Sequence, residues 1–243
     1  MWRIGHRGAA GHAPENTLAS IEAALEIGVD MVEVDVQATA DGRLVLLHDK
    51  RVDRTTDGTG RIGDLPWELV RRLDAGAGER VPLLEDAMAL VSGRSELLIE
   101  LIDPGIADMV GETIARAGRA HEVVVGSFHH RAVLAFGRAY PGVRTLALQE
   151  GIPVDGARFA LEAEVDLVGA SVDSLTKPYV DELHGHGLRL FIYTVNDERD
   201  IHELRCLGVD GLISDYPERV PRPTPAVVAP AQLRARHAGG KTD

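Results

Sequence analysis

Three acidic side chains stand inside two runs that are otherwise apolar. Glu33 and Asp35 interrupt "MVEVDV" (31–36), and Glu100 interrupts "LLIEL" (97–101). Side chains along a strand point alternately to its two faces, so Glu33 and Asp35 share one face. An ionised carboxylate in an apolar setting is costly unless a partner compensates for its charge. The pattern therefore predicts a compensating group beside these acids.

Carboxylates on neighbouring strands would repel one another strongly unless a cation lay between them. The ligands would all be oxygen atoms, with no paired cysteine or histidine spacing nearby, so Mg²⁺, Ca²⁺ or Mn²⁺ fits better than Zn²⁺. The alternative is that each acid pairs with an arginine or lysine on the same face. That alternative explains a single strand acid as well as a metal does, but three acids near strand ends favour the metal site.

Two histidines flank these acids in the sequence. His6 ends the run "RIGH" (3–6), and His48 ends the run "LVLLH" (44–48). Across a metal-bound phosphate, such a pair could take a proton from the attacking group and give one to the leaving oxygen. Arg7 offers a forked guanidinium for the phosphate itself. A lone histidine at a strand end is more often structural, but two beside an arginine favour acid–base chemistry.

A regular scaffold must position these residues. The sequence predicts one, because short apolar runs typical of strands are each followed by a stretch with the period of a helix. The candidate strands span residues 3–6, 31–36, 96–101, 122–128, 144–149, 166–171, 189–195 and 211–215. The amphipathic stretches between them include 16–26, 106–117, 131–140, 177–186 and 197–207, and several end at glycine, as helices commonly do. Eight strands alternating with helices predict an α/β protein, a (β/α)8 TIM barrel rather than an open doubly wound sheet.

One segment breaks this alternation. Residues 42–62, "GRLVLLHDKRVDRTTDGTGRI", are predicted to form a hairpin-like excursion after the second strand. Excursions there lie on the barrel face where active sites form. In a barrel the valines of the second strand pack under the helices, so Glu33, Asp35 and Glu100 are predicted to point toward the barrel axis.

Composition narrows the classes of function. A formal net charge of −12 over 243 residues argues against a nucleic-acid or anionic-membrane surface, because phosphate backbones demand clustered positive charge. Cys206 is the only cysteine, which excludes a disulfide framework and suits a reducing cytosol. With no membrane span and no signal peptide discernible, we expect a cytoplasmic protein. Residues 1–220 are predicted to form one domain, and 221–243 a poorly ordered tail rich in proline and alanine.

Several short motifs occur in an order that resembles the signature blocks of the glycerophosphodiester phosphodiesterase family. They are "HRG" (6–8), "PENT" (14–17), "EVDV" (33–36), "TADG" (39–42), "HD" (48–49), "LIEL" (98–101), "SF" (127–128), "YTVND" (193–197) and "GVDGLISDYP" (208–217). The resemblance covers the chain from residue 4 to about 217. One such motif alone would be weak, but many in the right order are specific.

The resemblance implies a TIM barrel that uses a divalent cation to hydrolyse small-molecule glycerophosphodiesters to an alcohol and glycerol 3-phosphate. In the family mechanism the neighbouring glycerol hydroxyl attacks phosphorus, and water then opens the cyclic phosphate. Carried over by position, it implies metal ligation by Glu33, Asp35 and Glu100, acid–base roles for His6 and His48, and phosphate contact by Arg7.

Further residues of these motifs are expected at the rim of the site. Glu15 is expected to have a site role, whereas Asn16 either helps to start a helix or belongs to the site. Ser127, Phe128 and Tyr193 are expected to shape the glycerol side of the pocket. For the two aromatic residues, plain packing is an equally good explanation.

One position departs from the family pattern. Family members usually carry a lysine two residues after the third-strand glutamate, and this chain has Ile102 there. Losing one charged phosphate contact costs about 1.5–3 kcal/mol, roughly ten- to hundredfold in affinity, if nothing replaces it. Two alternatives therefore stay open: a barrel that binds phosphodiesters with weak or no turnover, and a lyase that stops at the cyclic phosphate of lysophospholipid-like diesters. His6 and His48 argue against a pure binder.

Overall fold

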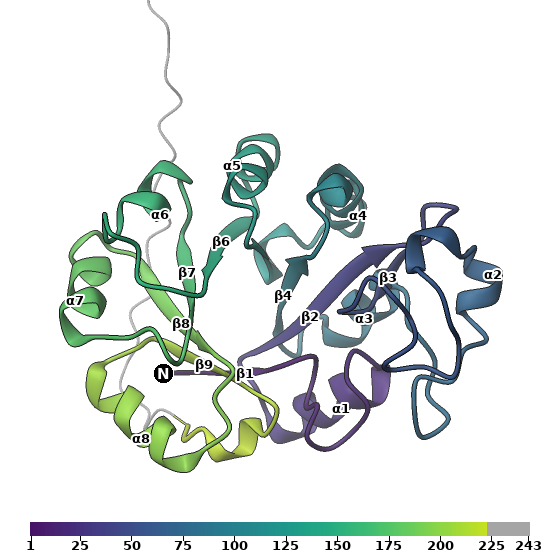
Figure 1. The fold of residues 1–243 in the computed structure, drawn as a ribbon, viewed down its shortest axis with the longest axis horizontal. Coiled ribbons are helices and arrows are strands. Elements are labelled where there is room, and N and C mark those ends of the chain that lie inside the picture. Colours follow the sequence, from purple (N-terminus) through teal and green to yellow (C-terminus); the bar gives the residue numbers. More distant parts are fainter. Residues whose placement is uncertain (223–243) are drawn as a thin grey trace, which may run out of the picture.

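The computed structural model describes residues 1–222 and shows a closed barrel of strands inside a ring of helices (Figure 1). The parallel barrel strands are β1 (Trp2–Gly5), β2 (Met31–Ala38), β4 (Glu96–Leu101), β5 (Val123–Ser127), β6 (Arg144–Gln149), β7 (Leu167–Ser171), β8 (Arg189–Tyr193) and β9 (Gly211–Ser214). They pair in this order, and β9 pairs with β1 to close the barrel. The predicted (β/α)8 TIM barrel is confirmed, with one strand at each predicted run.

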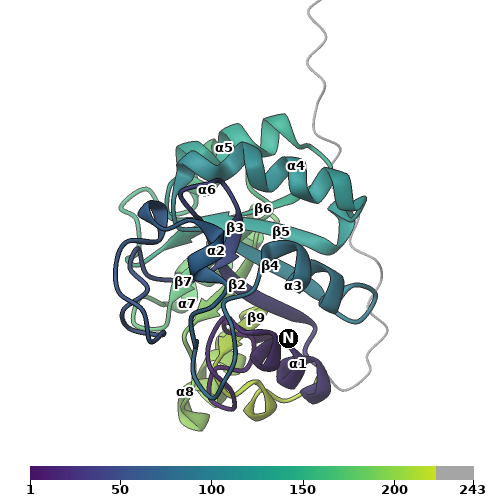
Figure 2. The ribbon, with the colours of Figure 1, turned by 90° about the vertical axis from the view of Figure 1, so that its right-hand side faces the viewer.

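The helices cover the outside of the barrel (Figures 1 and 2). They are α1 (Leu18–Ile27), α3 (Leu84–Val91), α4 (Ala107–Ala117), α5 (His130–Ala139), α6 (Arg158–Glu162), α7 (Lys177–Gly185) and α8 (Glu198–Leu207). As predicted, α1, α4 and α8 end at glycines with positive φ, namely Gly28, Gly118 and Gly208. Thr17 caps the start of α1, so Asn16 does not. Within residues 1–222, no helix combines the length and apolarity needed to cross a membrane.

The barrel-strand side chains divide between the barrel axis and the side that faces the helices, as strand alternation requires. One cluster fills the barrel axis and contains Ile4, Met31, Leu98, Val124, Leu146, Leu148, Leu167, Phe191 and Ile213. The other side of β2, with Val32 and Val34, packs under the helices. Since Glu33 and Asp35 alternate with these valines, their side chains share the inner face with Met31.

The excursion forms the predicted hairpin and extends further than the sequence indicated. β3 (Leu44–Leu46) pairs antiparallel with β2, and α2 (Trp67–Val70) follows before α3. Apolar side chains of this segment form a separate small core, made of Val45, Leu47, Val52, Ile62, Val70, Ala75 and Val81. Short 3₁₀ turns complete the fold at Ile62–Asp64, Pro104–Ile106, Ala120–Glu122 and Pro217–Arg219. The predicted tail, apart from its first two residues, lies outside the described residues.

Candidate active site

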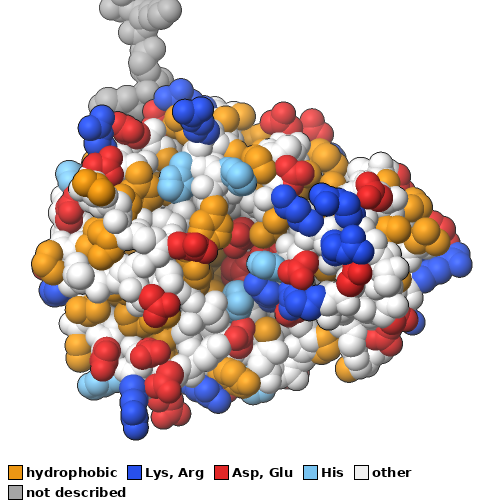
Figure 3. Space-filling model, in the orientation of Figure 1, with side chains coloured by type: hydrophobic (Ala, Val, Ile, Leu, Met, Phe, Trp, Pro, Cys, Tyr) orange, Lys and Arg blue, Asp and Glu red, His pale blue; other side chains and the backbone are white. Residues whose placement is uncertain are grey.

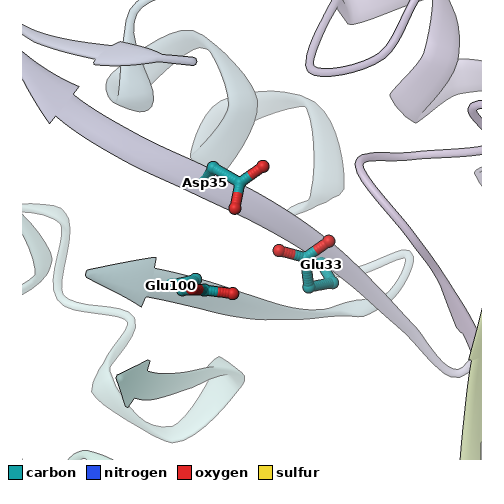
Figure 4. A group of neighbouring side chains, drawn as sticks. All are labelled: Glu33, Asp35 and Glu100. Carbon is teal, nitrogen blue, oxygen red and sulfur yellow. The ribbon is translucent and has the colours of Figure 1, made fainter. Parts of the chain in front are cut away.

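Three carboxylates meet at the inner face of β2 and β4. Glu33, Asp35 and Glu100 each offer an oxygen atom within 4.8 Å of the others. The two strands are adjacent, with Asp35 directly beside Glu100 in register, and the three side chains converge (Figure 4). Glu33 and Asp35 are almost fully buried, at 4% and 1% exposure. Figure 3 shows acidic side chains at the bottom of a central hollow, with histidine and basic side chains along its margin.

Burial of these acids makes their negative charges costly. Burial first, and then the charges of Asp35 and Glu100, raise the pKa of Glu33 well above its ordinary value. Burial, with the charge of Asp35, raises the pKa of Glu100 to about 8. Arg7 opposes both shifts. With all three carboxylates ionised, the cluster and one guanidinium would carry a formal charge of −2, which one divalent cation would neutralise.

Arg7 lies between the carboxylates and the rim of the barrel. Its backbone N–H donates to Glu33 at 2.8 Å, and its Nη1 donates to Glu15 Oε1 at 2.6 Å. Its Nε lies 3.1 Å from Asp35 Oδ2 but at an angle that makes no hydrogen bond, so this buried donor has no acceptor among the described residues. Arg7 therefore places its positive charge directly beside the acids.

Asn16 holds Asp35 in place. Its Nδ2 donates to Asp35 Oδ2 at 2.8 Å, and its Oδ1 accepts from the backbone N–H of Asp35 at 3.1 Å. Of the two roles considered for Asn16, the structure supports contact with the acidic cluster, because Thr17 is the helix cap.

The two histidines each contact a carboxylate through Nδ1. His6 Nδ1 lies 2.6 Å from Asp215 Oδ1, and His48 Nδ1 lies 2.7 Å from Asp49 Oδ1. Asn196 in turn donates to the other oxygen of Asp215 at 2.6 Å. An ionised carboxylate only accepts, so each Nδ1 carries the proton and each neutral ring has an unprotonated Nε2.

The pKa values of the two histidine partners support this assignment. Hydrogen bonds and charges from His6, Asn196 and Arg7 outweigh burial, the largest single effect, and lower the pKa of Asp215. The pKa of Asp49 is lowered mainly by Arg54, which binds it with two nitrogen atoms. Both partners are therefore ionised at neutral pH.

Comparison with known proteins decides the family. The family model of the glycerophosphoryl diester phosphodiesterases matches residues 6–219. This chain belongs to that family. By family it is a phosphodiesterase, and its TIM barrel carries the acidic cluster at the inner face of β2 and β4.

Relatives in this family align over nearly the whole chain. A glycerophosphodiester phosphodiesterase of Bacillus altitudinis is 35% identical over 241 residues, covering 89% of this chain and 95% of its own. Another from Caldanaerobacter subterraneus is 33% identical over 228 residues, covering 88% of this chain and 94% of its own. Among solved structures, an Oleispira antarctica phosphodiesterase in complex with the product sn-glycerol-3-phosphate superposes with a TM-score of 0.83 at 28% identity, covering 89% and 94% of the two chains.

The other predicted pocket residues of this phosphodiesterase lie at the ends of β5 and β8. Phe128 is 42% exposed, and its ring meets that of Tyr193 edge-on at 6.0 Å between centroids. The hydroxyl of Tyr193 donates to the backbone oxygen of Gln149 at 2.6 Å. Ser127 is fully buried, and its hydroxyl donates to the backbone oxygen of Leu101 at 2.8 Å.

Sequence reasoning gave no role to four residues that contact the candidate acid–base and phosphate groups directly or through one carboxylate. They are Asp49, Arg54, Asn196 and Asp215. Three of them lie inside the motifs that carried the family resemblance, "HD", "YTVND" and "GVDGLISDYP", and that position was the available signal. Arg54 lies outside every motif and gave none.

Proposed function

We propose that the protein hydrolyses glycerophosphodiesters to an alcohol and sn-glycerol 3-phosphate with a divalent cation bound at Glu33, Asp35 and Glu100. The observation that carries the proposal is the convergence of these three carboxylates, at the positions the family resemblance implies, in a chain that the family model matches over residues 6–219. The product-bound Oleispira relative supports the substrate class.

The acidic cluster fits a hard divalent cation. Its donors are all carboxylate oxygens, two of its three side chains are buried, and its formal charge when fully ionised is −2 beside Arg7. Mg²⁺, Ca²⁺ and Mn²⁺ all accept such ligands. When bound, the cation supplies charge neutralisation for the substrate phosphate and polarises its oxygens. Asn16 orients Asp35 for this role through its two hydrogen bonds.

His6 and His48 act as the acid–base pair of the proposed reaction. The unprotonated Nε2 of one ring takes the proton of the neighbouring glycerol hydroxyl, whose oxygen attacks phosphorus. The bond from phosphorus to the alcohol oxygen breaks, and the other ring, protonated at this stage, gives that oxygen its proton. Water then attacks phosphorus in the cyclic phosphate. The bond between phosphorus and the oxygen of the glycerol hydroxyl that attacked first now breaks. The two histidines exchange roles in this step: the one that gave its proton takes one from water, and the other gives its proton to the glycerol oxygen. Both histidines return to their starting protonation.

The remaining residues bind and shape the substrate. The guanidinium of Arg7 supplies positive charge for the phosphate beside the acidic cluster, and Glu15 holds the Arg7 side chain. Phe128 and Tyr193 form an aromatic wall for the glycerol. Ser127 directly precedes Phe128, and its hydroxyl, which donates to the backbone oxygen of Leu101, fixes the end of β5 beside this wall.

Phosphorus NMR of glycerophosphocholine tests the proposal. With Mg²⁺, Ca²⁺ or Mn²⁺ the substrate signal should convert to that of glycerol 3-phosphate, and EDTA should stop the conversion. Failure with all three metals, despite binding, would support the non-catalytic alternative. A cyclic phosphate that persists would support the lyase alternative, which stays open because Ile102 replaces the lysine usual in the family.

A matched pair of variants tests the metal ligands. Glu100→Gln should lower divalent-dependent kcat by at least about a thousandfold without unfolding the protein, because an amide does not replace a ligand charge. Glu96→Gln removes a carboxylate on the same face of β4 at the other end of the strand, where it pairs with Arg144, and should keep activity. Retained activity in Glu100→Gln would show that Glu100 is not a ligand.

A further inference from the structure

One arginine of the excursion binds two carboxylates that belong to different parts of the proposed site. Arg54 donates through Nη1 and Nη2 to the two oxygens of Glu15, each at 2.8 Å. It also donates through Nε to Asp49 Oδ2 at 2.7 Å, and through Nη2 to Asp49 Oδ1 at 3.1 Å. A guanidinium is planar and rigid, so four bonds of this kind fix both carboxylates relative to each other.

Each of these carboxylates holds a group that the proposed reaction uses. Asp49 Oδ1 accepts from His48 Nδ1 at 2.7 Å, and Glu15 Oε1 accepts from Arg7 Nη1 at 2.6 Å. Arg54 is therefore linked to the His48 ring through one residue, Asp49. It is linked to Arg7, the proposed phosphate-binding residue, through one residue, Glu15.

The two contacts join segments that lie far apart in the sequence and that are each also hydrogen-bonded to Asp35 of β2. Glu15 lies between β1 and α1, whereas Asp49 and Arg54 lie in the excursion, which β3 and its small apolar core attach to β2. His48 must face the acidic cluster from this excursion. Gln37 Nε2 donates to the backbone oxygen of His48 at 2.9 Å. This bond fixes the backbone of His48 but not the orientation of its ring, which depends on Asp49.

The charge states agree with a tight network. Hydrogen bonds to Glu15 and Asp49 raise the pKa of Arg54, while those of Arg54 lower the pKa of Asp49. Burial is the largest single effect on Glu15, yet the bonds and charges of Arg54 and Arg7 together outweigh it and lower its pKa. All three groups are ionised at neutral pH, so each bond in the network joins opposite charges.

We propose that Arg54 is a positioning residue for the phosphodiesterase reaction: it fixes the ring of His48 through Asp49 and the guanidinium of Arg7 through Glu15. The inference rests on the proposed function, because it assigns Arg54 a purpose within that reaction. The hydrogen bonds and ion pairs of Arg54 are with Glu15 and Asp49 and with none of the three proposed metal ligands, so its effect passes through these two carboxylates.

The excursion offers a matched control for the same substitution. Arg51 lies three residues earlier, and its contact is with Asp53 at 3.0 Å, a pair that reaches no group of the site. The side chains of Arg51 and Arg54 are exposed to similar extents, 56% and 47%. Arg51→Gln and Arg54→Gln thus remove the same charge from the same segment. The Arg51–Asp53 pair is isolated and exposed, so it contributes little to stability, whereas the network of Arg54 contributes somewhat more.

Steady-state kinetics separate positioning from a structural role. Arg54→Gln should lower kcat about ten- to hundredfold, the range expected when a reacting group is displaced, and raise KM only a few-fold, because Arg7 keeps its contacts with Glu33 and Asp35. Arg54→Lys keeps the charge but not the fork, so it should recover part of this loss. Arg51→Gln should match the wild type, and the thermal unfolding temperature should change by no more than about 2 °C in any variant.

Nitrogen NMR of the histidine rings gives a readout that does not depend on turnover. At pH 8 the His48 ring of the wild type should hold its proton on Nδ1, with its signals assigned by their loss in His48→Gln. In Arg54→Gln the same ring should become a mixture of tautomers, because Asp49 is no longer held. In Arg51→Gln it should be unchanged.

The outcomes are distinguishable from a failure of the proposed function. If the wild type converts no glycerophosphodiester, the proposed function fails, and the NMR comparison still decides whether Arg54 fixes the His48 ring. An unchanged His48 tautomer in Arg54→Gln, or a kcat within twofold of the wild type, would overturn the inference. So would a loss of kcat matched by Arg51→Gln or by a large drop in unfolding temperature.

Discussion

Asn16 shows at the level of a single residue how the buried acids are oriented. Its backbone has a φ of 57°, in the left-handed region that asparagine tolerates better than most residues. That conformation comes directly before the helix cap and lets its amide bind both the carboxylate and the backbone of Asp35. The side chain is 3% exposed, so a substitution would leave Asp35 with unpaired polar groups in a buried setting.

Ile102 is the residue at which this chain departs from its family, and it supports a prediction about the phosphate. It follows β4 directly and is half-buried, two residues beyond Glu100. Ile102→Lys places a cation at this position, and we expect KM for glycerophosphocholine to fall about tenfold, in line with one added charged phosphate contact. Steady-state kinetics at saturating metal measure it.

The control for Ile102→Lys must add the same charge elsewhere. Leu161→Lys in α6 does so at a side chain that is already 38% exposed. It should leave KM unchanged, since a distant charge is screened. A KM that is unchanged or raised in Ile102→Lys would mean that Ile102 does not face the phosphate subsite.

At the scale of elements, the excursion carries His48 on a small apolar core of its own. Val52 is fully buried in that core. Val52→Ala should lower the free energy of unfolding of this segment by about 2 kcal/mol, from lost transfer energy and the cavity left behind. We expect faster amide hydrogen exchange in residues 44–83 and a lower kcat, with exchange in β4 to β9 unchanged.

Val180→Ala in α7 is the matched control for the excursion core. Val180 is also fully buried, but it packs in the cluster under the helices on the other side of the barrel. This variant should be destabilised to a similar degree while residues 44–83 exchange as in the wild type. Equal exchange changes in the two variants would show that the excursion does not open as a separate unit.

The sequence predicted the elements well because their signals are local. Apolar runs located all eight barrel strands, and strand alternation placed Glu33, Asp35 and Glu100 on the inner face, where the structure brings them together. The partners of the histidines and of Arg7 could not be predicted in this way. His6 and Asp215 are 209 residues apart, and such a contact leaves no periodic pattern in the chain. The excursion hairpin was predicted. Its full extent and the contacts of Arg54 were not, because they depend on how the side chains of the small core pack together.

At the scale of the whole molecule, barrel closure brings the first and last barrel strands into one site. Pairing of β1 with β9 sets His6 beside Asp215, and pairing of β1 with β2 sets Arg7 beside Glu33. The same closure encloses three carboxylates in a molecule whose formal net charge is already −12. Ionising these carboxylates in the metal-free folded protein is therefore unfavourable, and its stability should depend on pH.

The direction of that dependence follows from the raised pKa values of Glu33 and Glu100. In the unfolded chain a glutamate loses its proton near its ordinary pKa of 4.5, whereas folded metal-free protein keeps the Glu100 proton up to about 8. Between these limits the folded state holds more protons than the unfolded state, so the free energy of unfolding falls as pH rises. In EDTA we expect the unfolding temperature to drop by about 5–10 °C from pH 5 to pH 8.

A bound divalent cation should remove most of this drop, because it stabilises the ionised carboxylates and its affinity rises as they lose their protons. The stabilisation by Mg²⁺, Ca²⁺ or Mn²⁺ should therefore be small at pH 5 and largest at pH 8, as measured by calorimetry at each pH with and without EDTA. Glu100→Gln separates this effect from the general repulsion of a chain with net charge −12, since it removes a titrating group from the cluster and little else. Its unfolding temperature in EDTA should vary less with pH than that of the wild type. A metal-free wild type whose stability rises between pH 5 and pH 8 would mean that the three acids do not share one buried site.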